Sequence, residues 1–157
     1  FRTMEQPDFQ AEGHNPLCGD QVKIYLKLDD DNNIEDISFS ILTRIVGTYP
    51  EQNKMIVDAG ALALSKDPGP THVDPQCGYG IVCTLEGQPI PDLKIRTLSQ
   101  EHGQIFGTKP INWKQFPVGE ALRIIPNHSC LTSALHHLYH LFDDQEVTET
   151  WKPARGW

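Results

Sequence analysis

Alternation of apolar and polar residues is the first regular pattern along the chain. In VKIYLKL (22–28), apolar side chains alternate with lysine and tyrosine, which is typical of a strand with one buried face. The segment DDNN (30–33) then supplies a turn, and Ile34 to Phe39 returns. We therefore expect a β-hairpin here. Proline and glycine recur through residues 1–20, and that segment is expected to be irregular.

Short strand-like runs continue to the C-terminus. Turn residues separate them at intervals of roughly ten residues, which favours an antiparallel barrel or sandwich. CLTSALHH (130–137) offers one or two turns of helix, and the proline-containing segment 61–80 is expected to be a loop. The runs are ILTRIV (41–46), MIVDAG (55–60), YGIVCTL (79–85), LKIRTLS (93–99), QIFG (104–107), ALRIIP (121–126) and LYHLFDDQEVTETW (138–151). The predicted fold class is mainly β, an antiparallel barrel- or sandwich-like domain with an N-terminal β-hairpin and little helix.

Composition adds limits on what the chain can do. Its 157 residues, of which 38% are hydrophobic and 22% charged, suffice for one globular domain with a buried core. No apolar run approaches the roughly 20 residues of a membrane-spanning helix. The formal net charge of −8 argues against nucleic-acid binding, which needs clustered Lys and Arg.

The cysteines are expected to be reduced thiols. FRTMEQPDFQ (1–10) has no apolar segment of the kind found in signal peptides, so the expected location is cytoplasmic, where disulfides are rare. The four cysteines do not form paired CxxC motifs, so a metal site would need mixed ligands. The sequence also contains no Gly-rich phosphate loop and no GxSxG turn, which removes support for nucleotide binding and serine hydrolysis.

The leading candidate for chemistry is the pair His128 and Cys130, two positions apart after a turn at Pro126-Asn127. In an extended or turning segment this spacing projects both side chains to one side. An imidazole nitrogen and a thiolate together favour zinc, and two protein ligands would leave positions open for water or substrate. The alternative from the residues alone is a buried thiol with a capping histidine at a strand end.

Other polar residues form weaker candidates. Glu101 and His102 stand between two predicted strands, where they could act in acid–base chemistry or where a carboxylate could orient a metal-bound imidazole. A polar hairpin turn with Gly103 at a positive φ would explain the same residues. Cys18 and Asp20, around Gly19, could share a zinc or iron ion.

Three further histidines are expected to be surface or hydrogen-bonded residues. His136 and His140 have the i, i+4 spacing of metal ligands on a helix, and His137 stands beside them. The segment also fits a strand, however, and a strand would separate the two side chains.

Four segments of the chain resemble the C-terminal domain of the D-serine dehydratase/D-threonine aldolase family. These are metal-activated, pyridoxal-phosphate-dependent lyases of the fold type shared with alanine racemase. The resemblance covers about residues 37–157, and the segments follow the family's order and spacing. They are VDAGALALSKD (57–67), SQEHG (99–103), IIPNHSC (124–130) and TETWKPARGW (148–157).

This resemblance implies that His128 and Cys130 bind zinc, because the family's PNH-x-C segment carries its metal. The aldolase branch more often has aspartate in the second position and prefers manganese, so manganese is the second choice here. The implied substrate is a D-amino acid, D-serine or D-threonine. The metal would act as a Lewis acid on the β-hydroxyl, and pyridoxal phosphate would act as an electron sink.

The resemblance also implies that part of the active site lies outside this chain. In the resembled enzymes the pyridoxal-phosphate lysine and the phosphate-binding residues lie on an N-terminal (β/α)8-like barrel. No lysine here stands in a matching context, and the chain has no room for such a barrel. The chain is therefore expected to be inactive alone, with a barrel domain in trans or a second copy as its protein partner.

Residues 1–39 resemble a different family, the N-terminus of U-type iron–sulfur cluster assembly scaffolds. NPLCGD (15–20) carries this resemblance and implies Cys18 and Asp20 as cluster ligands. The scaffold family has two further cysteine ligands, and this sequence lacks their motifs. Cluster assembly is therefore only the alternative function. The expected organisation is thus a scaffold-like segment over 1–39, fused to a metal-binding β domain over 40–157.

Overall fold

The computed structural model describes residues 9–14, 21–28, 34–143 and 146–154. The strands and helices within these ranges follow one another with short connections, except for two longer ones, residues 65–79 between α1 and β5 and residues 108–120 between β7 and β8. Their bounds, in chain order, are β1 Phe9–His14, β2 Gln21–Leu28, β3 Ile34–Tyr49, the 3-10 turn η1 Pro50–Gln52, β4 Lys54–Val57, α1 Ala61–Leu64, β5 Gly80–Cys83, β6 Pro89–Leu98, β7 Gly103–Gly107, β8 Ala121–Pro126, α2 Ser129–Leu135, β9 Tyr139–Asp143 and β10 Glu146–Trp151.

The described part of the chain contains a closed antiparallel barrel of six strands, in the order β3-β4-β7-β6-β5-β8. Closure comes from pairing of β8 with β3, in which Ile41 lies opposite Ile124 and Arg44 opposite Ala121. A closed barrel leaves no unpaired strand edge within it. The prediction of a mainly β, barrel- or sandwich-like domain is confirmed, and the architecture is the barrel.

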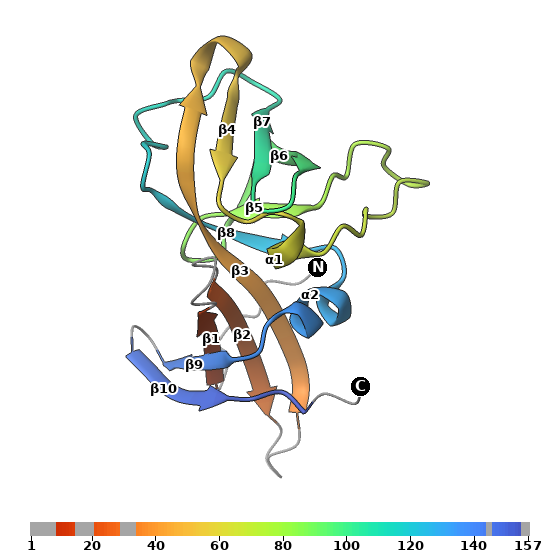
Figure 1. Cartoon of the computed structure of the whole chain (residues 1–157), viewed down its shortest axis with the longest axis vertical. Coiled ribbons are helices and arrows are strands. Elements are labelled where there is room, and N and C mark those ends of the chain that lie inside the picture. The colour runs from red at the N-terminus through yellow and green to blue at the C-terminus, as the bar shows by residue number, and fades with distance from the viewer. Residues whose placement is uncertain (1–8, 15–20, 29–33, 144–145, 155–157) are drawn as a thin grey trace.

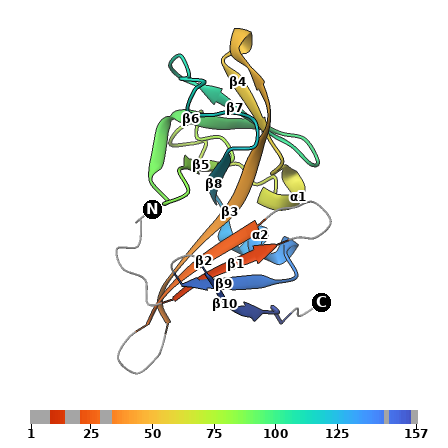
Figure 2. The same ribbon diagram turned by 90° about the vertical axis from the view of Figure 1, so that its left-hand side faces the viewer.

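Strand β3 joins the barrel to a second group of strands. Its C-terminal half pairs with β4 and β8, and its N-terminal half pairs with β2. Figures 1 and 2 show the barrel at one end of the molecule and β1, β2, β9 and β10 at the other, with β3 running through both. The expected boundary between residues 39 and 40 falls inside this strand.

The N-terminal hairpin predicted from alternation is present as β2 and β3, with Ile24 opposite Phe39. The expectation of an irregular segment over residues 1–20 was wrong for part of it, because residues 9–14 form β1. This strand pairs with β2 on one side and with β9 on the other. Its sequence, FQAEGH, carries no strong strand pattern, so pairing with its two neighbours decides its conformation.

The barrel interior is filled by the inward-facing residues of the alternating runs. Alternation breaks where the strands bulge: in β6 the pairing register shifts between Ile95 and Thr97, and Leu98 is buried in place of Thr97. The largest fully buried aliphatic side chains are Ile41, Ile45, Met55, Val57, Val82, Ile95, Ile105 and Ile124.

The two short helices lie side by side where the barrel meets the second group of strands (Figure 1). Helix α2 confirms the expected turn or two of helix in CLTSALHH. Segment 61–80 was expected to be a loop, but its first four residues form α1 (Ala61–Leu64). The rest, up to β5, consists of turns and irregular chain as expected. Neither helix of the described chain has the length and apolar character that a membrane crossing requires.

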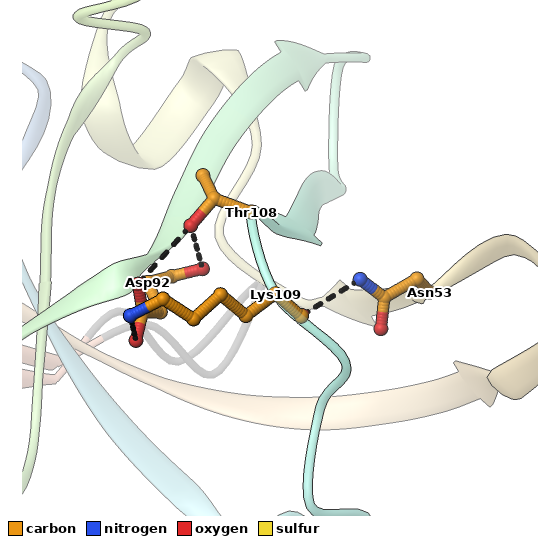
Figure 3. A network of polar contacts seen from close by, with 4 residues as sticks. All are labelled: Asn53, Asp92, Thr108 and Lys109. Atoms are coloured by element: carbon orange, nitrogen blue, oxygen red, sulfur yellow. Dashed lines mark hydrogen bonds and ion pairs between the residues drawn. The ribbon is translucent and has the colours of Figure 1, made fainter.

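Asn53 anchors the connection between β7 and β8 to the turn between β3 and β4 (Figure 3). It adopts a left-handed conformation with φ 48°, which asparagine tolerates better than most residues. Its amide nitrogen donates to the carbonyls of Gly107 (3.0 Å) and Lys109 (2.9 Å), and its amide oxygen accepts from the Ile111 N–H (3.0 Å). One side chain thus fixes three backbone groups of the neighbouring loop.

Replacing Asn53 with alanine is expected to lower the free energy of unfolding by about 2–3 kcal/mol, because three hydrogen bonds are lost. Asn53→Asp keeps an acceptor for the Ile111 N–H but places a carboxylate oxygen against the Gly107 and Lys109 carbonyl oxygens, so its loss should be at least as large. Lys109→Ala removes an ion pair to Asp92 in which Lys109 is 74% exposed, and it should cost less than about 1 kcal/mol. Urea denaturation measures all three. Equal losses for Asn53→Ala and Lys109→Ala would contradict the anchoring role.

Candidate metal site at the start of helix α2

His128 and Cys130 lie where β8 leaves the barrel and α2 begins. Strand β8 ends at the buried Pro126, and the Asn127 amide donates to the Gly78 carbonyl (2.8 Å), which fixes the chain after the strand. His128 has extended backbone angles (φ −135°, ψ 94°) and precedes α2, and Cys130 lies in its first turn. The end of β8 in the barrel wall therefore fixes the position of the backbone that carries both side chains.

Both side chains are exposed, so a metal ion could reach them. This contradicts the alternative of a buried thiol with a capping histidine. The Cys130 thiol is accessible to solvent, and the His128 side chain makes no capping hydrogen bond to α2.

A carboxylate from a distant part of the chain contacts His128. The His128 Nδ1–H donates to Asp67 Oδ2 at 2.7 Å, and the two side chains are 45% and 35% exposed. A carboxylate accepts hydrogen bonds, so in a neutral imidazole with this contact the proton lies on Nδ1 and Nε2 keeps its lone pair for another partner. Asp67 ends the VDAGALALSKD segment, and nothing in the sequence marked it as a partner of His128.

Two buried hydrogen bonds hold α2 against the C-terminal end of α1. Thr132 Oγ1 donates to the Leu64 carbonyl at 2.8 Å, and His136 Nε2 donates to the Ala63 carbonyl at 3.0 Å. His136 is 2% exposed, which confirms the expectation that it is a hydrogen-bonded histidine rather than an open metal ligand. His137 is exposed, and the His140 side chain lies outside the described residues.

Glu101 and His102 occupy the turn between β6 and β7. The Glu101 carboxylate accepts from Gln100 Nε2 (3.1 Å), and the His102 carbonyl accepts from Ser99 N–H (2.9 Å). In the described chain neither side chain forms a hydrogen bond or ion pair with His128 or Cys130, so their assignment to acid–base chemistry stays a prediction. Gly103 is not at a positive φ; a Cβ there would lie 2.6 Å from the Ala59 carbonyl oxygen, so glycine is needed for space.

Two of the other cysteines, Cys83 and Cys77, lie within the described residues. Cys83 is buried, and burial raises the pKa of its thiol to about 11, an effect that the charge of Arg123 partly offsets. Cys77 is half-buried in the loop after α1. Cys18 and Asp20, the candidate iron–sulfur or zinc ligands, lie outside the described residues. Among the residues described, no three His, Cys, Asp or Glu side chains gather closely enough to hold a metal.

Comparisons with known proteins place the chain in a family. The serine dehydratase domain model matches residues 38–142. D-serine dehydratase of Dictyostelium discoideum is 42% identical over 130 residues, which cover 79% of this chain and 32% of that protein. D-threo-3-hydroxyaspartate dehydratase of Delftia sp. HT23 is 34% identical over 127 residues, covering 78% and 33%.

Solved structures agree with these matches. An alanine racemase-like protein from Idiomarina loihiensis has a TM-score of 0.67 and 36% identity, and the Delftia enzyme has a TM-score of 0.67 and 35% identity. In each case the match covers 76% of this chain and 32% of the other. The chain thus spans about a third of the length of the relatives it matches. By the extent of the family match and the agreement of fold, the chain belongs to the serine dehydratase domain family.

Proposed function

We propose that this chain is the metal-binding module of a pyridoxal-phosphate-dependent D-amino-acid dehydratase, with His128 and Cys130 holding a zinc ion. The observation that carries the proposal is the pair of exposed ligands at the start of α2, with His128 Nδ1 already bound by Asp67 at 2.7 Å. This leaves the His128 Nε2 and the Cys130 sulfur as the atoms that would bind the metal.

The donor set fits zinc in an open site. Imidazole nitrogen and thiolate sulfur are ligands that zinc accepts readily, and sulfur disfavours harder ions such as magnesium. A site that keeps positions open is the catalytic kind, since a structural zinc site is closed by four protein ligands.

Two structures of one relative support the assignment by the residues changed in them. D-threo-3-hydroxyaspartate dehydratase has been solved as a cysteine-to-alanine variant in a metal-free form and as a histidine-to-alanine variant. The changed positions are two apart, with histidine first, the order and spacing of His128 and Cys130. That enzyme is 34% and 32% identical to this chain in those two structures.

The two protein ligands would hold the metal against the hydroxyl of a bound substrate. When bound, a metal at such a site supplies Lewis acidity to a substrate oxygen, and pyridoxal phosphate supplies an electron sink. Asp67 and α2 would keep the imidazole oriented, and the exposure of both ligands gives the substrate access. The chain spans about a third of its relatives, so we infer that the remaining catalytic groups lie on a barrel domain and that the isolated chain is inactive.

Zinc titration of the chelator-treated chain tests the proposal. We expect one zinc ion per chain by metal analysis, removable by chelator. Free zinc at a hundred times its dissociation constant should add about 2.7 kcal/mol to the free energy of unfolding. Magnesium at the same concentration is the control and should add much less. A chain that takes up no stoichiometric zinc, with an unchanged melting temperature, would contradict the assignment.

A further inference from the structure

We infer that Asp67 is a positioning residue for the metal site, a carboxylate that fixes the His128 imidazole in the tautomer and ring orientation that direct Nε2 outward. This inference rests on the proposed function. The short contact between His128 Nδ1 and Asp67 Oδ2, 2.7 Å, carries it. The partner that one ring nitrogen binds decides which nitrogen of a histidine carries the proton.

The contact is one of three that join α2 and its two flanking residues to the region of α1. Thr132 lies within α2, and His128 and His136 immediately precede and follow the helix. Their partners, Asp67, the Leu64 carbonyl and the Ala63 carbonyl, follow in the opposite chain direction.

Burial differs among these three contacts in a way that suits a metal site. Thr132 is fully buried and His136 is 2% exposed, so these two hydrogen bonds fix the helix. His128 at the outer end is 45% exposed. The three contacts therefore hold α2 firmly at its inner end and leave the imidazole accessible at its outer end, with Asp67 as the contact that limits ring rotation.

The backbone that delivers Asp67 is itself constrained. Ser65, between α1 and Asp67, has φ 60° and ψ 171°, a region that residues other than glycine rarely adopt. The hydrogen bonds from α2 to Ala63 and Leu64 hold the chain just before this point. Asp67 is thus placed by the same two helices that place His128, so the pair keeps a fixed geometry.

Asp67→Ala should weaken zinc binding by about 10- to 100-fold, the loss typical when a carboxylate behind a metal-binding histidine is removed. Asp67→Asn keeps the shape and an acceptor oxygen but loses the charge, so its loss should be smaller. Asp74→Ala is the matched control: it removes the same charge from an exposed residue of the same loop, whose carboxylate accepts from Gln76 N–H. It should change the zinc dissociation constant by less than about twofold, since salt screens exposed charges.

The tautomer gives a readout that a merely structural role would not change. Nitrogen NMR of the metal-free full chain, at a pH about two units above the ordinary pKa of histidine, should show His128 protonated at Nδ1. In Asp67→Ala, Nε2-protonated imidazole should appear, with the remaining spectrum preserved. This measurement needs no zinc, and Asp67→Leu, which also lacks an acceptor oxygen, provides it if the alanine variant does not fold.

The results separate this inference from the proposed function. If His128→Ala abolishes zinc binding but Asp67→Ala binds as wild type does, or weakens it no more than Asp74→Ala, the positioning role is overturned and the metal site stands. An unchanged His128 tautomer in Asp67→Ala overturns it as well. If the wild-type chain binds no zinc, the proposed function fails and the inference fails with it.

Discussion

Replacing Gly60 with alanine is expected to lower the free energy of unfolding by about 3–5 kcal/mol, the largest single effect on stability that we predict. An added Cβ would lie 2.4 Å from the His102 nitrogen and 2.5 Å from the Gln100 carbonyl oxygen. Both are backbone atoms, so no flexible side chain can move aside. Gly60 is needed because the chain before α1 touches the turn between β6 and β7.

The turn between β6 and β7 cannot move away from such a Cβ without weakening two hydrogen bonds. Ala61 N–H donates to the Ser99 carbonyl (2.9 Å) and Leu62 N–H to the Gln100 carbonyl (3.1 Å), and these bonds dock the start of α1 on the turn. A shift large enough to fit a methyl group would stretch both. The expected loss is therefore the overpacking strain plus about 1 kcal/mol for each bond.

Gly47→Ala is the matched control for this variant. Gly47 lies in β3 and has no positive φ, and its added Cβ would meet the flexible Tyr49 side chain at 3.4 Å. That is ordinary contact, so the free energy of unfolding should change by less than about 1 kcal/mol. Chemical denaturation of both variants gives the comparison. A Gly60→Ala protein as stable as Gly47→Ala would mean that α1 does not sit against the turn as the structure has it.

The sequence alone does not distinguish Gly60 from Gly47, because only the fold brings a backbone turn against Gly60. The same holds for the fold as a whole. Alternation predicted the hairpin of β2 and β3 and most barrel strands, since each needs only the pattern of its own residues. Barrel closure depends on Ile41 lying opposite Ile124, and any two strands with the same alternation could satisfy that pattern. The choice between barrel and sandwich was therefore left open, and β1, which its neighbours stabilise, was missed.

The same limit applies to the candidate site. His128 and Cys130 could be proposed because they are neighbours in the sequence and match a family segment. Asp67 is 61 residues from His128, and a lone aspartate in a proline-rich loop carries no local signal. Glu101, which the sequence offered as a nearby carboxylate, instead accepts from Gln100 in the described structure. Residues that are distant in the sequence and meet only in the fold cannot be recognised as partners before the fold is known.

Loss of either proposed metal ligand should have the largest effect on zinc binding. Removing a carboxylate behind a ligand costs about 10- to 100-fold in affinity, so removing one of two direct ligands should cost more than about a hundredfold. We expect this for both His128→Ala and Cys130→Ala, measured by competition with a chromogenic chelator. Because both side chains are exposed, neither change should destabilise the metal-free chain by more than about 0.5 kcal/mol.

Cys130→Asp is the more discriminating change, because it replaces a soft ligand with a hard one. Carboxylate oxygen suits manganese, whereas thiolate favours zinc, so the ratio of zinc to manganese affinity should fall while a two-ligand site is kept. Ser129→Ala, between the two ligands and equally exposed, is the control and should leave both affinities unchanged. If Ser129→Ala and Cys130→Asp gave the same metal preference, the sulfur of Cys130 would not be a ligand, and the metal would have to be held elsewhere.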